Sequence, residues 1–484
     1  MSLVLRGGRL PTADGTVDLL IEGGEIAQIA PAGRLRGDEV VALDGRWVIP
    51  GLWDQHVHFT QWAQTARRLD VSGVGSAAEA AELVRQHAVQ DADDGPIIGF
   101  GFHDALWPDV PTRDLLDAAA GDRPAVLIAG DLHCSWLNTA AARLFAPETA
   151  AHPEAAVLRE DASFAVTTRL AAADDETLDR WAQDAGRAAA ARGVVGVVDL
   201  EYGWNLDVWQ RRIAGGFDSL RVEFGIYTDH LQPAIDSGLR TGTRIPGTEG
   251  RLTVGPYKVI TDGSLNTRTA YCFDPYPDGG RGVQNLMPDE LVSWMSLAAA
   301  NGIEPAIHAI GDHANRIALD AFEAVGCTGR IEHAQLLTDE DVPRFARLGV
   351  VASVQPEHAM DDRDVADALW PGRTERAFPL AALHRAGVRL AFGSDAPVAP
   401  LDPWIAMAAA VSRSRGGREP WHPEQTIARR VALASSVRSE LAVGAAADIA
   451  VLDDDPFGCS LGALRSMPVA ATLLAGAFTY DTLR

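Results

Sequence analysis

The sequence predicts an α/β fold: a (β/α)8 TIM barrel with a small β-sandwich domain and an insertion after the first barrel strand. Through the middle of the chain, short β-branched apolar runs alternate with alanine-rich, helix-like segments. At both ends, strand-like runs are separated by turn signals. Several of the central runs end in polar residues, as barrel strands do at an active-site face. The 484 residues suffice for one large barrel and a satellite domain.

The two chain ends are predicted to form the β-sandwich domain. The N-terminal part contains short apolar runs at residues 2–6, 17–22, 25–29 and 39–43. The pairs Gly7-Gly8 and Gly23-Gly24 lie between them and signal turns. Similar runs return at residues 447–452 and 470–476. We therefore expect residues 1–50 and 440–484 to pair into one domain that is discontinuous in sequence.

The first barrel strand is expected to end in the segment Asp54-Gln-His56-Val-His58. Residues two apart on a strand face the same way, so His56 and His58 can offer two imidazoles to one metal ion. A lone His-x-His pair is weak evidence for a metal site. Asp54 is either a strand-end residue or a carboxylate that accepts a hydrogen bond from a metal-bound histidine.

The interval from His58 to Gly193 is too long for one crossover connection. Within a barrel domain at 51–439 we therefore expect an insertion at about residues 62–170, with its own apolar runs at 97–102 and 125–129. An insertion at this end of the barrel can overhang the active site. His133, in Gly-Asp-Leu-His, is a candidate to contact substrate or stabilise an oxyanion, or is a surface-loop histidine.

Tryptophans in the insertion and the barrel-mouth loops predict an aromatic-lined substrate pocket. The candidates are Trp107 and Trp136, together with Trp62 and Trp204. Such a pocket would suit an apolar or aromatic substituent. By base rate, however, most tryptophans belong to a core or a rim.

Seven further barrel strands are predicted to end near Glu201, Thr228, Thr261, Gly311, Gln335, His358 and Ala396, with helix-like segments such as 289–300 and 317–325 between them. Three polar residues close apolar runs here, namely His308, His333 and Asp395. Because barrel strands deliver their terminal side chains to one face, these three should meet His56 and His58 there. Together they predict a metal site.

Composition limits the partners of the chain. A net charge of −24 disfavours nucleic acid and anionic membrane surfaces, which need clustered Lys and Arg. No uncharged apolar run approaches the roughly 18 residues that span a bilayer, and no secretory signal is visible at the N-terminus. The four scattered cysteines suggest isolated thiols in a reducing compartment. We expect a cytoplasmic protein that acts on a small molecule, and a homodimer as the commonest assembly of soluble proteins.

These motifs resemble the metal-dependent amidohydrolase superfamily. Three phrases resemble its amidohydrolase 3 branch, which contains N-substituted formamide deformylase and many uncharacterised relatives. They are Lys-x-x-x-Asp-Gly-Ser-Leu-x-x-Arg-Thr-Ala from Lys258, His-Ala-Ile-Gly-Asp from His308, and Gly-Ser-Asp-Ala-Pro around Asp395. The resemblance covers nearly the whole chain. In that superfamily a His-x-His pair lies at the end of strand 1 and a Lys or Glu at the end of strand 4. A His lies at the end of each of strands 5 and 6, and an Asp at the end of strand 8.

The resemblance implies a centre with two divalent metal ions. His56, His58 and Asp395 would hold one ion, and His308 and His333 the other. Lys258 falls at the strand 4 position and would bridge the ions as a CO2-derived carbamate, because an ammonium cannot ligate a cation. The alternative is an ion pair of Lys258 with Asp262 or Asp199 in a one-metal site. Zinc is expected, although histidine and carboxylate ligands also accept manganese or iron.

The resemblance further implies a hydrolase of a non-peptide carbon–nitrogen bond, in an N-acyl, N-formyl or cyclic amide of a small molecule. A bound metal lowers the pKa of water to about 7 and so provides a nucleophile, and Asp395 would be the general base. The alternatives are a heterocycle deaminase or an esterase on the same barrel, or a catalytically dead binding protein. The strand 5 phrase lacks the His-x-x-Glu of deaminases, and no expected ligand is missing.

Four further candidates have open roles. Arg268 could meet a substrate carboxylate or pair with an acid. Asp312 could orient a metal ligand or cap a helix. Asp262 belongs to the phrase after strand 4 and could support a metal ligand without binding the metal itself. His358, with Glu357 and Trp370 near strand 7, could line the substrate pocket.

Overall fold

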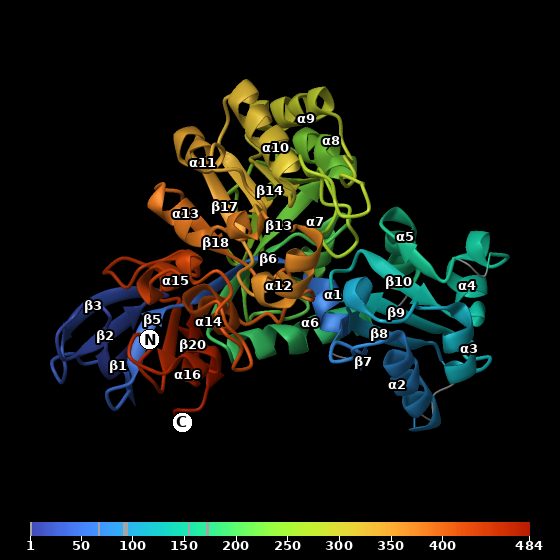
Figure 1. The fold of residues 1–484 in the computed structure, drawn as a ribbon. Coiled ribbons are helices and arrows are strands. Elements are labelled where there is room, and N and C mark those ends of the chain that lie inside the picture. Colours follow the sequence, from blue (N-terminus) through green and yellow to red (C-terminus); the bar gives the residue numbers. More distant parts are fainter. Residues whose placement is uncertain (1, 66–67, 91–94, 153–154, 171–173) are drawn as a thin grey trace.

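A parallel eight-stranded barrel forms the centre of the molecule, with a sheet of the two chain ends on one side and the insertion on the other (Figure 1). The computed structural model describes residues 2–65, 68–90, 95–152, 155–170 and 174–484. None of the helices within these ranges is long and apolar enough to cross a membrane.

The barrel strands follow one another in chain order around the sheet. They are β6 (Leu52–Val57), β12 (Val194–Asp199), β13 (Arg221–Tyr227), β14 (Leu252–Ile260), β15 (Pro305–Ala309), β16 (Gly329–His333), β17 (Val350–Val354) and β18 (Leu390–Phe392). Most of their residues are buried, as expected of β-branched strands covered on both faces. The predicted (β/α)8 barrel is confirmed.

Helices surround this barrel. They are α6 (Asp175–Ala190), α7 (Asn205–Ala214), α8 (Thr228–Asp236), α9 (Pro288–Ala300), α10 (Asp312–Val325), α11 (Val342–Leu348), α12 (His358–Leu369), α13 (Leu380–Arg385), α14 (Pro403–Ser412) and α15 (Arg429–Ser435). Their apolar faces and the outer faces of the strands share one large core.

The barrel closes between its first and last strands. Beyond the end of β18, Ala396 forms a parallel bridge with Val57, the Asp395 amide donates to the His56 carbonyl (2.7 Å), and the His58 amide donates to the Ala396 carbonyl (2.8 Å). A Cβ atom on Gly393 would lie 2.7 Å from the His56 backbone nitrogen, so only glycine permits this approach.

The two chain ends build one eight-stranded sheet. Its strands are β1 (Ser2–Arg9), β2 (Thr16–Glu22), β3 (Glu25–Pro31), β4 (Glu39–Ala42), β5 (Trp47–Pro50), β19 (Ile449–Leu452), β20 (Val469–Leu474) and β21 (Ala477–Asp481). Strands β5 and β19 join the ends by antiparallel pairing, with Val48 opposite Val451. A separate apolar core holds this sheet together. The sheet made of both chain ends is the one that the sequence predicts.

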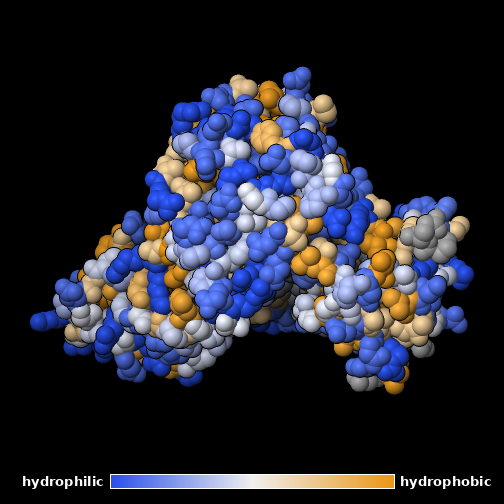
Figure 2. All heavy atoms as spheres, viewed as in Figure 1, coloured by the Kyte–Doolittle hydropathy of each residue, from blue (hydrophilic) through white to orange (hydrophobic). Residues whose placement is uncertain are grey.

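The insertion forms an α/β unit of its own. It follows α1 (Phe59–Thr65), whose buried apolar residues belong to the barrel core. The insertion contains β7 (Leu69–Asp70), α2 (Ala77–Gln90), β8 (Ile97–Phe102), α3 (Arg113–Ala120), β9 (Ala125–Ala129), β10 (Cys134–Leu137), α4 (Thr139–Phe145), β11 (Val157–Arg159) and α5 (Asp161–Leu170). Its five strands lie in the order β11-β10-β9-β8-β7. On the face seen in Figure 2, hydrophilic side chains predominate, and hydrophobic ones gather where the insertion adjoins the barrel.

Candidate metal centre

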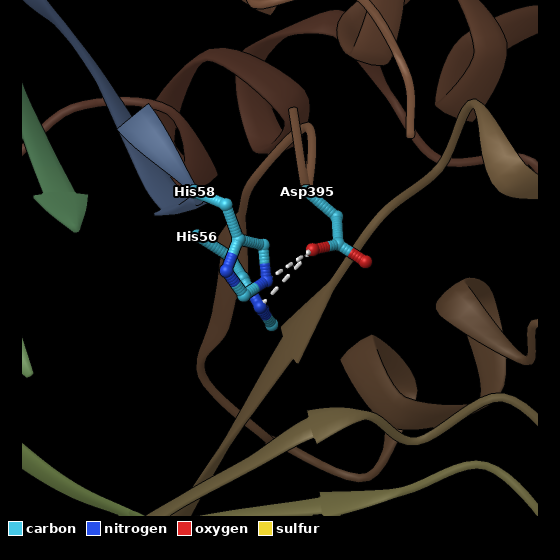
Figure 3. Close-up of side chains that lie close together, drawn as sticks. All are labelled: His56, His58 and Asp395. Carbon is cyan, nitrogen blue, oxygen red and sulfur yellow. Dashed lines mark ion pairs between the residues drawn. The ribbon is translucent and has the colours of Figure 1, made fainter. Parts of the chain in front are cut away.

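The side chains predicted to ligate metal lie together at the carboxyl ends of the barrel strands, all buried. They are His56 from β6, His58 directly after β6, Lys258 from β14, His308 from β15, His333 from β16 and Asp395 after β18. Asp395 Oδ1 lies 3.2 Å from His56 Nε2 and 3.3 Å from His58 Nε2, so the carboxylate faces both rings (Figure 3).

Two of these residues adopt the left-handed backbone conformation. His333 has φ 72° and Asp395 has φ 57°, a conformation that costs a non-glycine residue roughly 1–2 kcal/mol. Such strain persists where the surrounding structure enforces it, often at functional sites. The turn at His333 lets two consecutive residues contact His56: the rings of His333 and His56 are 5.1 Å apart, and Glu332 hydrogen-bonds to His56 as well.

Glu332 fixes the tautomer of His56. Its Oε2 lies 2.7 Å from His56 Nδ1. Burial alone would raise the pKa of Glu332, but Arg330 and His56 outweigh it and keep that pKa well below its usual range. An ionised carboxylate only accepts hydrogen bonds, so His56 Nδ1 carries the proton and Nε2 presents a lone pair. Burial and the nearby Lys258 also lower the pKa of His56 to about 4.

The charge states around Asp395 fit a cation. Burial would raise the pKa of Asp395, but His56, His58 and His333 outweigh it, and the pKa lies well below the usual range. The lone pair of His56 Nε2 and the Asp395 carboxylate are two acceptors 3.2 Å apart with no proton to share. A metal ion would satisfy both. Glu332, on the other ring nitrogen of His56, is the carboxylate that usually stands behind a ligating histidine in metal sites.

Unpartnered ring nitrogens support the same conclusion. Within the described ranges, His58 Nδ1, His333 Nδ1 and His358 Nε2 are buried without a hydrogen-bond partner. Two groups have ligand atoms within 4.8 Å of one another: His56, His58 and Asp395, and His333, His358 and Asp395. The residues present therefore fit a divalent metal, with Asp395 shared between the two groups.

The second group differs from the predicted pair of His308 and His333. His308 lies next to His333, with ring centroids 4.4 Å apart. Its Nε2, however, is 3.5 Å from both the Gly263 carbonyl and Asp262 Oδ1. His358, expected only to line the pocket, takes the third place in the group and also lines the cavity.

Lys258 is buried in the middle of the site. Its Nζ lies 3.4 Å from His56 Nε2, and none of the described carboxylates is within ion-pair distance of it. The ion pair proposed with Asp262 or Asp199 is therefore wrong. Asp262 instead accepts three backbone N–H groups, and Asp199 accepts from the Phe59 amide and the Trp209 indole. Burial lowers the pKa of Lys258 to about 8.

A cavity of about 810 Å³, including its open mouth, covers these residues. The barrel supplies the predicted ligands and two tyrosines, Tyr202 and Tyr227. Tyr202 stacks on His58, with centroids 5.5 Å apart. The insertion supplies part of the wall, including His133 and Phe164. The insertion therefore faces the site.

His133 points into this cavity from the loop between β9 and β10. Its Nδ1 lies 2.8 Å from Glu160 Oε2, and its ring centroid is 6.4 Å from that of His308. Burial alone would lower the pKa of His133, but the hydrogen bond and negative charge of Glu160 outweigh it and raise the pKa to about 9. The hydrogen bond to Glu160 therefore favours the protonated form of His133.

Polar contacts fasten the insertion to the loop after β14. Ser264 donates to Asp131 Oδ2 (2.8 Å), and Thr267 and Thr269 donate to Glu160 Oε1 (3.0 and 2.6 Å). These residues belong to the Asp-Gly-Ser-Leu phrase and its continuation. The phrase thus positions the insertion, and through Glu160 it positions His133.

The two insertion tryptophans do not line the cavity, contrary to the prediction. Trp136 is fully buried in the insertion core, and its indole donates to the Thr112 carbonyl. Trp107 packs against Phe102 and Trp136 in the same cluster. The insertion is large enough to need a core, which takes these side chains. Aromatic lining of the cavity comes instead from Phe164, Tyr202 and Tyr227.

The structure decides three other predicted roles. Of the two alternatives for Arg268, it favours the ion pair over substrate contact, since Arg268 lies on the surface and pairs with Asp278 (3.1 Å). Asp312 neither orients a ligand nor caps α10, since Gly311 holds the cap position; it accepts from the Phe273 amide and pairs with Arg376. Asp54 accepts from the backbone of His56 and Ser394 instead of a histidine ring, and burial raises its pKa to about 7.

Sequence comparison adds the family. The model of the amidohydrolase family matches residues 39–480, and this range includes the whole barrel and every residue of the site. The chain belongs to the amidohydrolase family.

Curated and solved relatives cover nearly the whole amidohydrolase chain. Protein LONG AFTER FAR-RED 3 of Arabidopsis thaliana is 28% identical, over 99% of this chain and 88% of the relative. N-substituted formamide deformylase of Arthrobacter pascens is 27% identical, over 96% and 94%. The crystal structure of an uncharacterised metal-dependent hydrolase from Pyrococcus horikoshii superposes with a TM-score of 0.79 at 26% identity, over 96% of this chain and 99% of that one.

The family and the buried histidine and aspartate cluster give the coarse function. This amidohydrolase is a metal-dependent hydrolase that acts on carbon–nitrogen bonds other than peptide bonds.

Glu332 is the ligand-supporting residue that sequence analysis missed, and its removal should weaken metal binding. In Glu332→Gln the acceptor for His56 Nδ1 becomes neutral, so the ring is less basic and less firmly oriented. We expect a roughly 10- to 100-fold loss of metal affinity, measured by competition with a chelator. Glu340→Gln, the same change on an exposed surface residue, is the control. Unchanged affinity in Glu332→Gln would contradict this role.

Proposed function

We propose that this amidohydrolase hydrolyses an N-formyl, N-acyl or cyclic amide of a small molecule. The observation that carries the proposal is the ionised Asp395 facing His56 and His58 inside a covered cavity. The resemblance to N-substituted formamide deformylase supports an N-formyl or similarly small acyl group.

Two metal ions are proposed for the centre, zinc being the first candidate. His56, His58 and Asp395 would hold one ion, and His333 the other, with His358 or His308 completing its ligands. When bound, a divalent metal supplies a water-derived nucleophile near neutral pH and polarises the substrate carbonyl.

Asp395 is proposed as the general base. Its pKa below the usual range keeps it ionised and able to accept a proton at its carboxylate oxygen. It would then return that proton to the leaving nitrogen, since an amide nitrogen leaves as a neutral amine only when protonated.

His133 is proposed to bind the carbonyl oxygen as negative charge develops on it. The imidazolium is aimed by Glu160 into the cavity beside His308. A fixed cation at that position stabilises charge without having to reorganise during the reaction.

Lys258 is proposed to carry a carbamate whose oxygens would help to hold the metal ions. It is the only lysine in the sequence, so all the others of the 42 lysine and arginine residues are arginines. An amine can lose its proton and react with CO2, whereas a guanidinium stays charged. Burial lowers the pKa of Lys258 to about 8, which favours the reactive neutral amine.

The proposed reaction is tested by an assay of the metal-loaded enzyme against N-formyl, N-acetyl, N-carbamoyl and lactam compounds. We expect turnover of at least one of these classes. Asp395→Asn should abolish that turnover more completely than it weakens metal binding, because an amide oxygen still ligates but cannot accept the proton. Asp339→Asn, on the surface, is the control. Failure of wild-type enzyme with every class would refute the proposal.

The carbamate can be observed directly because only one side-chain amine exists. Wild-type enzyme loaded with metal and carbon-13 bicarbonate should give a lysine carbamate signal by nuclear magnetic resonance, and Lys258→Ala should not. Wild-type enzyme should bind about two metal ions per chain, and Lys258→Ala should bind fewer and lose activity. A short carboxylic acid in excess should restore part of the metal content and part of the activity. A bare amine in fully metallated wild-type enzyme would overturn the assignment.

The role of His133 predicts a particular pH dependence. A raised pKa means that the cation persists above pH 6.5 and is lost as the pH rises through about 9; bound metal cations would lower that midpoint. We therefore expect kcat/KM to fall on the alkaline side, at or below pH 9. His133→Gln should lower kcat and abolish this alkaline fall in kcat/KM, while the metal content stays at the wild-type level. Loss of metal in parallel with activity would contradict the assigned role.

A further inference from the structure

Asn266 is an unsatisfied polar side chain at the catalytic cavity. It follows β14 in the phrase Asp-Gly-Ser-Leu-Asn, lines the cavity, and is 5% exposed. Within the part of the chain that the structure describes, neither its Oδ1 nor its Nδ2 has a hydrogen-bond partner, and both atoms are buried. A buried amide without partners is destabilising and therefore needs an explanation.

The loop holds Asn266 in this position. On one side, Ser264 donates to Asp131 of the insertion (2.8 Å). On the other side, Thr267 donates to Glu160 (3.0 Å). Between them, Leu265 is buried in an apolar cluster. Since both neighbouring segments are anchored, the side chain cannot swing into bulk solvent to find partners.

The unpaired atoms define what a ligand must offer. A carboxamide presents one acceptor and one N–H donor side by side, so its complement carries a donor and an acceptor on one edge. Another amide, a lactam or a ureido group has this edge. A carboxylate would satisfy only Nδ2, and an ammonium only Oδ1.

The charge of the cavity wall also disfavours a carboxylate. Asp131, Asp361 and Asp362 line the same cavity. Arg415 neutralises Asp361 from outside (2.6 Å), and Gln335 donates to Asp362 (2.9 Å). Burial also raises the pKa of Asp362 to about 8. An anionic group would therefore face mainly the carboxylate of Asp131, which would not repel a neutral amide.

We propose that Asn266 is a specificity-determining residue that recognises a second amide group of the substrate, separate from the bond that is hydrolysed. The N–H of this group donates to Oδ1, and its carbonyl accepts from Nδ2. The inference rests on the proposed function, since it selects among N-acylated small molecules those with a second amide.

The test compares matched substrates. One series is ω-(formylamino)carboxamides with one, two or three methylene groups between the two functions. In the other series an isosteric isopropyl group replaces the terminal carboxamide. Metal-loaded wild-type enzyme should prefer one carboxamide over its isostere by at least about 10-fold in kcat/KM, because an unpaired buried amide penalises the isostere.

Substitution then assigns the preference to Asn266. Asn266→Leu should bring the ratio to about one or below, and it should raise the melting temperature by removing two unpaired polar atoms. Asn266→Asp, which keeps the volume and the acceptor but loses the donor, should give an intermediate ratio. Arg268→Gln, in the same loop but on the surface, should keep the wild-type ratio. An unchanged ratio in Asn266→Leu would overturn the inference.

Failure of the inference and failure of the proposed reaction give different results. If no compound of either series is hydrolysed, the enzyme does not act on N-formyl compounds, and the unreacted compounds become ligands for calorimetric titration. A carboxamide should then bind wild-type enzyme more tightly than its isostere, and Asn266→Leu should remove the difference. Equal binding of the pairs to wild-type enzyme would refute the role of Asn266 whether or not turnover occurs.

Discussion

Closure of the barrel between β6 and β18 is the constraint on which the rest of the structure depends. The hydrogen bonds that join these segments involve the backbone of His56, His58 and Asp395, whose side chains form the first ligand group. Barrel closure and assembly of the site are therefore the same event. The absence of a side chain at Gly393 permits the close approach, and Asp54 secures it by accepting from the backbone of both segments.

Burial and charge then set the properties of the centre. Desolvation keeps the histidine rings neutral, and neutral rings are the form that ligates metal. Glu332 and Asp395 stay ionised because cationic or hydrogen-bonding neighbours outweigh their burial. The result is a site with acceptors directed inward and one amine, Lys258, that burial makes easy to deprotonate. The only strong positive charge facing in from the insertion belongs, among the described residues, to His133.

Sequence pattern predicted the parts that follow from periodicity. The two-residue spacing of His56 and His58, and the polar ends of apolar runs at His333 and Asp395, follow from regular strands. Glu332 was missed because strand alternation turns it away from the site, and the left-handed turn at His333 cannot be inferred from the local sequence. Trp107 and Trp136 were misplaced because hydrophobic residues in an insertion serve its own core. The phrase after Lys258 was recognisable, but its contacts with Asp131 and Glu160 join segments far apart in the chain.

The pairing of the two chain ends has a consequence for the order of folding during synthesis. Strand β5 leads through Gly51 directly into β6, which carries His56 and is directly followed by His58, and β5 pairs with β19 near the other end of the chain. The first metal-binding strand, β6, is therefore synthesised well before the segment after β18 that closes the barrel against it, and before β19, which pairs with β5. The centre can mature only after β18 and Asp395 have been synthesised, and until then the long central part of the chain has to remain soluble without it.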